Sequence, residues 1–163
     1  VPHGCIAQHG VSWLYPPMQR LLLKLIAGCG VGGGHVRTVS FELWALPEGA
    51  SAGEFRDDLR LVAGDLGCVV GSSYTSFSGF RCEDGAGSVQ LALTARLLER
   101  AGFAWWDLGQ EHTYKTDLGA ELIPRADFIK RFHRTRDETT STLDSNIAFT
   151  GNELMANDAQ RAS

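Results

Sequence analysis

The sequence lacks the features that mark a disulfide scaffold, a membrane span or a protein that coats nucleic acid. Its cysteines, Cys5, Cys29, Cys68 and Cys82, include no C-x-x-C pair, and no signal-peptide pattern occurs, which favours a reduced, cytoplasmic compartment. No apolar run reaches the roughly 18 residues that a membrane span needs, so no membrane partner is expected. A formal net charge of -4 argues against electrostatic coating of nucleic acid, though not against holding a terminal nucleotide.

Two patterns look like ligand sites but are incomplete. Cys5 and His9 have the spacing of helical metal ligands, but a proline and two glycines nearby oppose a helix. The glycine-rich stretch 28–34 lacks both the GK[ST] of a phosphate loop and a preceding strand, so we interpret it as a flexible connection. Neither a metal nor a nucleotide cofactor is therefore expected.

The 163 residues fit a single domain that is long enough to bury a core. Apolar periodicity predicts helices over 18–27, 89–100 and 125–134. β-branched and aromatic residues predict strands over 36–46, 61–74 (two short strands or one bent strand), 103–106 and 121–123. The expected fold class is α+β, with a mixed, mostly antiparallel sheet of five or more strands flanked by helices. After a domain of residues 1–136, the polar residues 137–163 predict an extended or weakly ordered tail.

The strand over 36–46 alternates between two faces. The core face is expected to carry Val39, Phe41, Leu43 and Ala45. The other face carries Glu42 beside Trp44, an unusual pair for a plain solvent face. The ordinary interpretation of Trp44 is a cross-strand aromatic residue that covers the edge of the sheet.

The short apolar run 103–106 stops at Asp107. A carboxylate at the end of a buried strand stands where a sheet opens to solvent, which is a frequent place for chemistry. The alternative is that Asp107 caps the turn that follows it.

The stretch 96–125 resembles the end of the catalytic domain of leucyl/phenylalanyl-tRNA protein transferases. In that family an Asp-x-Gln follows the strand, and a Ser-Leu-Gly-Ala and an Ile-Pro-Arg come later; here Asp107, residues 117–120 (Asp-Leu-Gly-Ala) and residues 123–125 (Ile-Pro-Arg) correspond. Residues 40–44 are similar to the family's Ser-Val-Glu-Val-Trp. The resemblance extends over most of the chain, from Ser12 to Phe132.

This resemblance implies a fold, an activity and partners. The fold would be acetyltransferase-like (GNAT-like), and the enzyme would move an amino acid from charged tRNA onto a protein N-terminus, as in N-degron protein degradation. The implied partners are the 3′ end of aminoacyl-tRNA and the N-terminus of an acceptor protein. A small N-terminal domain precedes this region in the family, so the chain is expected to be the core of a longer protein.

The resemblance also implies the site. Asp107 would take a proton from the amine or orient it, and Gln110 would hold it, one residue beyond Gly109, which aligns with the family's glutamine. The implied substrate-binding residues are Glu42, Trp44, Tyr74, Phe77, Ser78, Phe80, Gly87, Ser88 and Trp106. Phe77 stands where the family has glutamate. Gly87 and Ser88 would meet a donor phosphate at a helix start, although a capping turn without a ligand is an equal alternative.

Several alternatives stay open. The donor amino acid is leucine, phenylalanine, methionine or arginine, with Glu42 as the partner of a cationic donor. A domain of the same fold that binds a peptide or a tRNA end without catalysis is a second hypothesis. An acyl-CoA N-acyltransferase is disfavoured, because the Q/R-x-x-G-x-G/A loop is missing before Ser88. The basic cluster Lys130, Arg131, His133, Arg134 and Arg136 is either solvated surface or a contact with the tRNA backbone.

Overall fold

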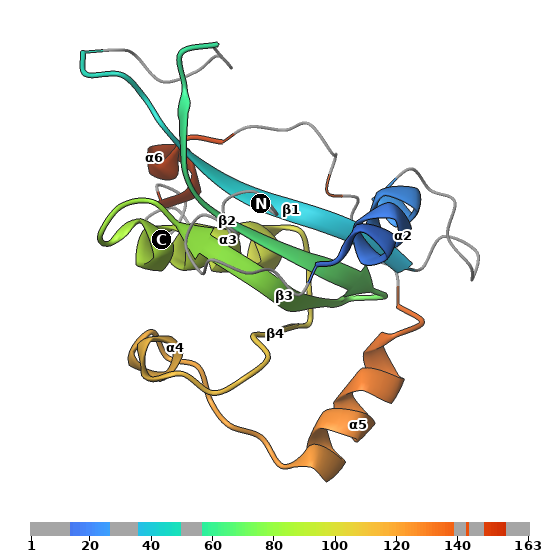
Figure 1. Cartoon of the computed structure of the whole chain (residues 1–163). Helices are drawn as coiled ribbons and strands as arrows, with labels where there is room; N and C mark the ends of the chain where they lie inside the picture. The colour runs from blue at the N-terminus through green and yellow to red at the C-terminus, as the bar shows by residue number, and fades with distance from the viewer. Residues whose placement is uncertain (1–13, 27–35, 50–56, 139–142, 144–148, 156–163) are drawn as a thin grey trace.

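The computed structural model describes residues 14–26, 36–49, 57–138, 143 and 149–155, and the following concerns these residues. Their elements are, in order, α2 (Pro16–Ile26), β1 (Val36–Ala45), β2 (Arg60–Val70), β3 (Ser73–Arg81), α3 (Ala86–Arg100), β4 (Trp105–Asp107), α4 (Thr113–Asp117), α5 (Arg125–Thr135) and α6 (Gly151–Met155). Helix α2 packs on one face of the sheet and α3 on the other (Figure 1). No helix in these ranges is long and apolar enough to cross a membrane.

The sheet is mixed and mostly antiparallel, as predicted. Its order is β1-β2-β3-β4; the first two pairings are antiparallel, and β3 runs parallel to β4. The prediction of five or more strands is wrong for the described residues, which form four. The expected strand over 121–123 is irregular, because Leu122 is 67% exposed and so packs on no core, and Pro124 already caps α5.

Residues 61–74 contribute to two strands of a hairpin rather than to one bent strand. The chain turns at Gly71, whose φ of 58° suits glycine. The register of β2 against β3 shifts between Leu66 and Gly67. A Cβ at Gly67 would lie 2.5 Å from the Tyr74 ring. The absence of a side chain at Gly67 therefore lets the Tyr74 ring lie against β2.

Apolar clusters cover both faces of the sheet. Leu66 packs against Leu14 and Leu22 beside α2. On the other face Tyr74 packs with Val69 and with Leu98 of α3. The predicted core face of β1 is confirmed, since its four apolar residues all pack on this side, in clusters that include Val39, Phe41, Leu43 and Ala45.

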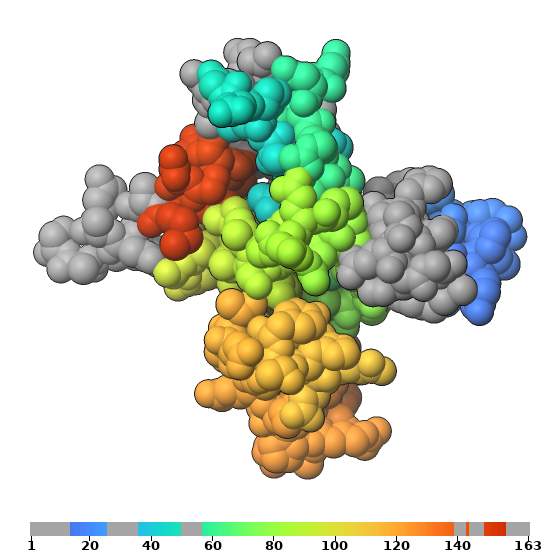
Figure 2. Space-filling view, turned by 60° about the vertical axis from the view of Figure 1, so that its left-hand side comes forward, coloured from blue at the N-terminus to red at the C-terminus, as the bar shows by residue number. Residues whose placement is uncertain are grey.

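The C-terminal end of α5 is attached to the hairpin turn. The amide of Ser72 donates to the carbonyl of Thr135 (3.0 Å), and the indole of Trp105 donates to the Thr135 hydroxyl (2.9 Å). The side chain of Thr135 is buried. From this attachment α4 and α5 form a lobe beside the sheet (Figures 1 and 2).

Within residues 137–163, for which the sequence predicted an extended or weakly ordered tail, the described residues include one short helix, α6. Thr150 and Glu153 form a reciprocal capping box: the Thr150 amide donates to Glu153 Oε2 (2.7 Å), and the Glu153 amide donates to the Thr150 hydroxyl (3.1 Å). Leu154 is buried, and Arg100 of α3 donates to its carbonyl (3.2 Å). The Thr-x-x-Glu spacing was the sequence signal for this helix.

Candidate functional site

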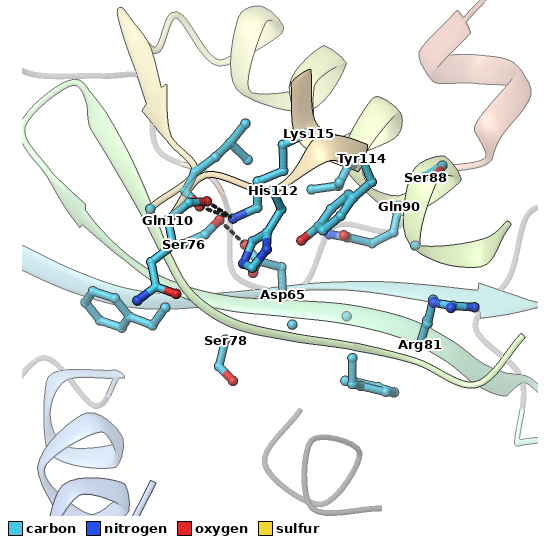
Figure 3. A pocket seen from close by; sticks show the side chains of 18 of the residues that line it. Asp65, Ser76, Ser78, Arg81, Ser88, Gln90, Gln110, His112, Tyr114 and Lys115 are labelled. Carbon is cyan, nitrogen blue, oxygen red and sulfur yellow. Dashed lines mark hydrogen bonds between the residues drawn. The ribbon is translucent and has the colours of Figure 1, made fainter. Parts of the chain in front are cut away.

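A cleft of about 1080 Å³ opens beside β3. β4 pairs with β3 only over Ser73–Thr75, and beyond Asp107 the chain leaves the sheet toward α4 (Figure 1). The space is walled by β3, by the N-terminal half of α3 and by residues 108–115. In Figure 3, Ser76, His112, Tyr114 and Lys115 lie around Asp65 of β2 on one side of the strands, whereas Ser78 points to the other side. The short fourth strand therefore creates the site.

Asp65 is the buried carboxylate of this cleft. Its side chain is 5% exposed, and its Oδ2 accepts hydrogen bonds from the Tyr74 hydroxyl (2.7 Å) and the Ser76 hydroxyl (2.6 Å). The indole of Trp106 donates in turn to Ser76 Oγ (2.9 Å). Because the Trp106 indole has only a hydrogen to offer, Ser76 must use its own hydrogen for Asp65. This network therefore presents Asp65 as an acceptor.

The environment raises the pKa of Asp65. Burial raises it, while the hydrogen bonds from Ser76 and Tyr74 and the charge of Lys115 act in the opposite direction. The pKa of Tyr74 is also raised, first by burial and then by the charge of Asp65, so this phenol stays a donor. For Lys115, burial lowers the pKa, opposed by the charges of Asp65 and Asp107.

Lys115 ties the outer wall of the cleft together. Its ammonium donates to the carbonyl of Leu108 (2.6 Å) and to that of Gln110 (2.9 Å). It also lies 5.8 Å from the centre of the Tyr114 ring. Two charge-assisted bonds from one side chain to nearby carbonyls hold residues 108–110 against α4.

Six of the site residues predicted from the sequence lie on the cleft wall, namely Phe77, Ser78, Phe80, Gly87, Ser88 and Gln110. Phe77 is the extra residue where the register of β3 shifts against β2. The helix start at Gly85 has no side-chain cap, so its role as an anion site stays a prediction. Cys5, His9 and residues 28–34 lie outside the described residues.

Five of the predicted residues do not line the cleft, and four of them, Glu42, Trp44, Tyr74 and Trp106, lie on β1, β3 and β4. Trp44 pairs with Leu61, and Glu42 accepts a hydrogen bond from Ser40 (3.1 Å), both on β1 at the opposite edge of the sheet from β4. The structure therefore does not bring Trp44 to one pocket with Phe77. Tyr74 and Trp106 lie behind the wall, with ring centres 5.9 Å apart, and reach the site only through hydrogen bonds.

Asp107 ends β4, as the sequence predicted, but its carboxylate is turned to the backbone. Its Oδ1 accepts a hydrogen bond from the amide of Gly109 (2.9 Å). The cleft wall includes Leu108, Gly109 and Gln110 but not Asp107. Gly109 has a φ of 73°, which a glutamine in that place would adopt only with strain. This geometry matches the alternative in which Asp107 caps the turn.

The cleft contains residues that the sequence analysis missed: Asp65, Ser76, Gln90, His112, Tyr114 and Lys115. One of them carried a signal, since Asp65 is the single charged residue inside the apolar run 61–70. A charge in a buried strand is costly unless it is hydrogen-bonded or used. Among the described residues no group of three or more metal-ligating side chains occurs.

Comparison with known proteins shows which family the chain belongs to. A family model described as leucyl/phenylalanyl-tRNA protein transferase matches residues 3–133, which include every segment of the cleft wall. The chain belongs to this family.

Its relatives are longer than the matched region. A leucyl/phenylalanyl-tRNA protein transferase of Thiobacillus denitrificans is 42% identical over 74 residues, which cover 45% of this chain and 32% of that protein. One of Xanthomonas euvesicatoria is 37% identical over 81 residues, covering 50% and 32%. One of Nitrosomonas eutropha is 26% identical over 141 residues, covering 85% and 51%. The chain therefore spans about a third to a half of the curated relatives it matches.

Proposed function

We propose that this chain carries the reaction centre of an aminoacyl-tRNA protein transferase. The reaction moves an amino acid from the 3′ end of charged tRNA to the N-terminal amine of an acceptor protein. The observation that supports it is the cleft, whose walls all come from the segment shared with the family. Because the reaction consumes charged tRNA, we place it in the cytoplasm.

The reaction requires the protein to position the two substrates and to remove one proton. An aminoacyl ester is already activated, so the enzyme must hold it against an amine and remove a proton from that amine. The cleft offers apolar surface from Phe77, Phe80 and Leu91 for a donor side chain. Glu42, the expected partner of a cationic donor, is away on β1. We therefore infer an apolar donor, such as leucine, phenylalanine or methionine.

We also propose the fold of this chain, a surface that contacts tRNA and a further domain in the whole protein. The parallel pair of β3 and β4, which parts beyond Thr75, fits an acetyltransferase-like fold, and we propose that fold. The exposed basic side chains of α5, including Lys130 and Arg134, are suited to the phosphates of tRNA. The greater length of the relatives supports a further domain in the whole protein.

We expect the protein at full length to transfer at least one apolar amino acid to a peptide. The assay uses tRNAs charged with leucine, phenylalanine, methionine or arginine and peptides that begin with arginine, lysine, aspartate or glutamate. Labelled amino acid recovered on the peptide measures transfer. Transfer only from arginyl-tRNA would overturn the assignment of the donor. No transfer from any pair would contradict the enzyme and favour a domain that only binds a peptide or a tRNA end.

For Asp107 we propose a positioning role, through the turn that carries residues 108–110 into the cleft. In Asp107→Asn the amide oxygen can still accept the bond from Gly109, whereas Asp107→Ala loses it. We expect Asp107→Ala to lower the rate of transfer by about tenfold or more, and Asp107→Asn to lower it clearly less. Equal losses in the two variants would mean instead that the carboxylate charge itself takes part, as the sequence suggested.

A further inference from the structure

We propose that Asp65 accepts the proton of the attacking amine when the new peptide bond forms. This inference rests on the proposed function and goes beyond it, because it assigns the proton transfer to a residue of β2 that no sequence motif marks. The cleft, the burial of the carboxylate and the direction of its hydrogen bonds carry the argument.

The hydrogen bonds leave one exchangeable position on the carboxylate. Both bonds that Asp65 accepts go to Oδ2, from Tyr74 and Ser76. Oδ1 accepts none from the described residues, and it lies beside Gly79 on the cleft wall, 3.6 Å from where a Cβ of that glycine would be. A proton that enters or leaves Asp65 therefore does so at Oδ1. That oxygen has space beside it, because Gly79, which pairs with Asp65 across the ladder, carries no side chain.

The other titratable groups around Asp65 are placed for different tasks. Tyr74 on β3 is held as a donor, and Lys115 on α4 spends two of its three hydrogens on backbone carbonyls. Tyr114 has a raised pKa from burial, and His112 is exposed and stacked on it, with ring centres 5.7 Å apart. From α3, Gln90 is uncharged, and from β1 the neighbour in the ladder is Phe41.

The second carboxylate of the described wall is Asp84, and it is unsuited to the step. Its side chain is fully exposed, and it pairs with Arg81 (2.8 Å) at the mouth of the cleft. An exposed carboxylate that is engaged with a guanidinium at the surface is not enclosed with the reacting atoms. Asp65, by contrast, has a raised pKa, which brings its basicity closer to that of the amine nitrogen whose proton it must take.

The step balances with the groups that the proposed reaction supplies. The nitrogen of the acceptor's N-terminal amine attacks the ester carbonyl carbon, and the carbon–nitrogen bond forms. One proton passes from that nitrogen to Oδ1 of Asp65. The bond between the carbonyl carbon and the ribose oxygen then breaks, and that oxygen leaves as a hydroxyl after taking a proton. Asp65 returns to its ionised form by giving its proton to this ribose oxygen, so no other reactant is needed.

The acceptor amine fits this site better than the donor's own α-amino group. The donor amine keeps its protons throughout the reaction, so its partner should remain ionised and carry a low pKa. Burial instead makes ionised Asp65 unfavourable, which suits a group that is protonated during turnover.

The test measures kcat and KM against pH for the full-length protein and three variants. Asp65→Asn should lower kcat by about 10²-fold or more, with unchanged affinity for puromycin, an adenosine that carries an amide-linked amino acid. Tyr74→Phe removes a donor that stabilises ionised Asp65, so the acid limb of the rate profile should move to higher pH while alkaline turnover persists. Glu99→Gln, an exposed carboxylate near the far end of α3, is the matched control and should behave as the wild type.

Each result supports or overturns the assignment of Asp65 as the base. Turnover of Asp65→Asn at the wild-type rate would overturn the proposal, and so would a loss of puromycin affinity without a loss of kcat. An acid limb that stays in place in Tyr74→Phe would point to a different base, such as His112, and this readout holds even if Asp65→Asn fails to fold. If the wild type transfers nothing, the proposed function fails instead, which is a separate outcome.

Discussion

Replacing Gly67 by alanine is expected to destabilise the protein by about 3 kcal/mol. The new Cβ would lie 2.5 Å from Cε2 of the Tyr74 ring, and closer still to the carbonyl oxygen of Thr75. Neither can retreat easily, since Tyr74 is completely buried and Thr75 is bonded within the sheet. The loss is measured as the difference in unfolding free energy between the variant and the wild type in denaturant, provided that their m-values are equal.

The matched control is Gly79→Ala on the neighbouring strand. Its Cβ would lie 3.3 Å from the nearest atom, the carbonyl oxygen of Gly64, which asks for a shift of a few tenths of an ångström. We expect a loss of less than about 1 kcal/mol for this variant. Similar losses in the two variants would contradict the view that the contact between Tyr74 and Gly67 organises the hairpin. That contact also matters for the site, since it aims the Tyr74 hydroxyl at Asp65.

Gly71→Ala is the second large expected effect, at about 3 kcal/mol in unfolding free energy. Two costs combine there. Alanine is disfavoured at a φ of 58°, and its Cβ would lie 2.5 Å from the carbonyl carbon of Arg136 and closer to the oxygen of Thr135. Because the end of α5 is attached at this turn, the variant should also loosen α5, seen as faster amide hydrogen exchange over 125–135.

Gly102→Ala separates the two costs. Gly102 has a φ of 74°. Apart from its chain neighbours, no atom of the described residues lies within 4 Å of where its Cβ would be. This variant should therefore lose only the backbone term, roughly 1 kcal/mol, and leave exchange in α5 unchanged. Equal losses for Gly71→Ala and Gly102→Ala would mean that the close approach of α5 to the turn contributes nothing.

The helices and the strand faces could be predicted because their signals are local. The apolar spacing over 18–27 anticipated α2 (Pro16–Ile26) within two residues at its start. Alternation in β1 assigned its core face correctly, since successive side chains of any strand point to opposite sides. The same local logic failed at 121–123, where an apolar pair of residues had no neighbouring strand to join.

The site could be predicted only in part. Ser78, Phe80 and Gln110 were anticipated from the resemblance and lie on the cleft wall. Trp44 was expected there too, but a short-range motif does not say at which edge of the sheet its strand will lie. The order of the strands places β1 and β4 at opposite edges.

By itself the sequence determined the family, through its resemblance to known members. It also determined the α+β class, the position of Asp107 at a strand end and the core face of β1, because each of these three follows from residue type and spacing. The tertiary structure alone decided which carboxylate faces the cleft. Asp65 meets Ser76 because the hairpin pairs Ser76 with Gly67, the next residue on the same face of β2, and Lys115 meets Leu108 because α4 folds back on its own approach. Register and chain reversal depend on packing across the whole sheet, so no local pattern of residues encodes them.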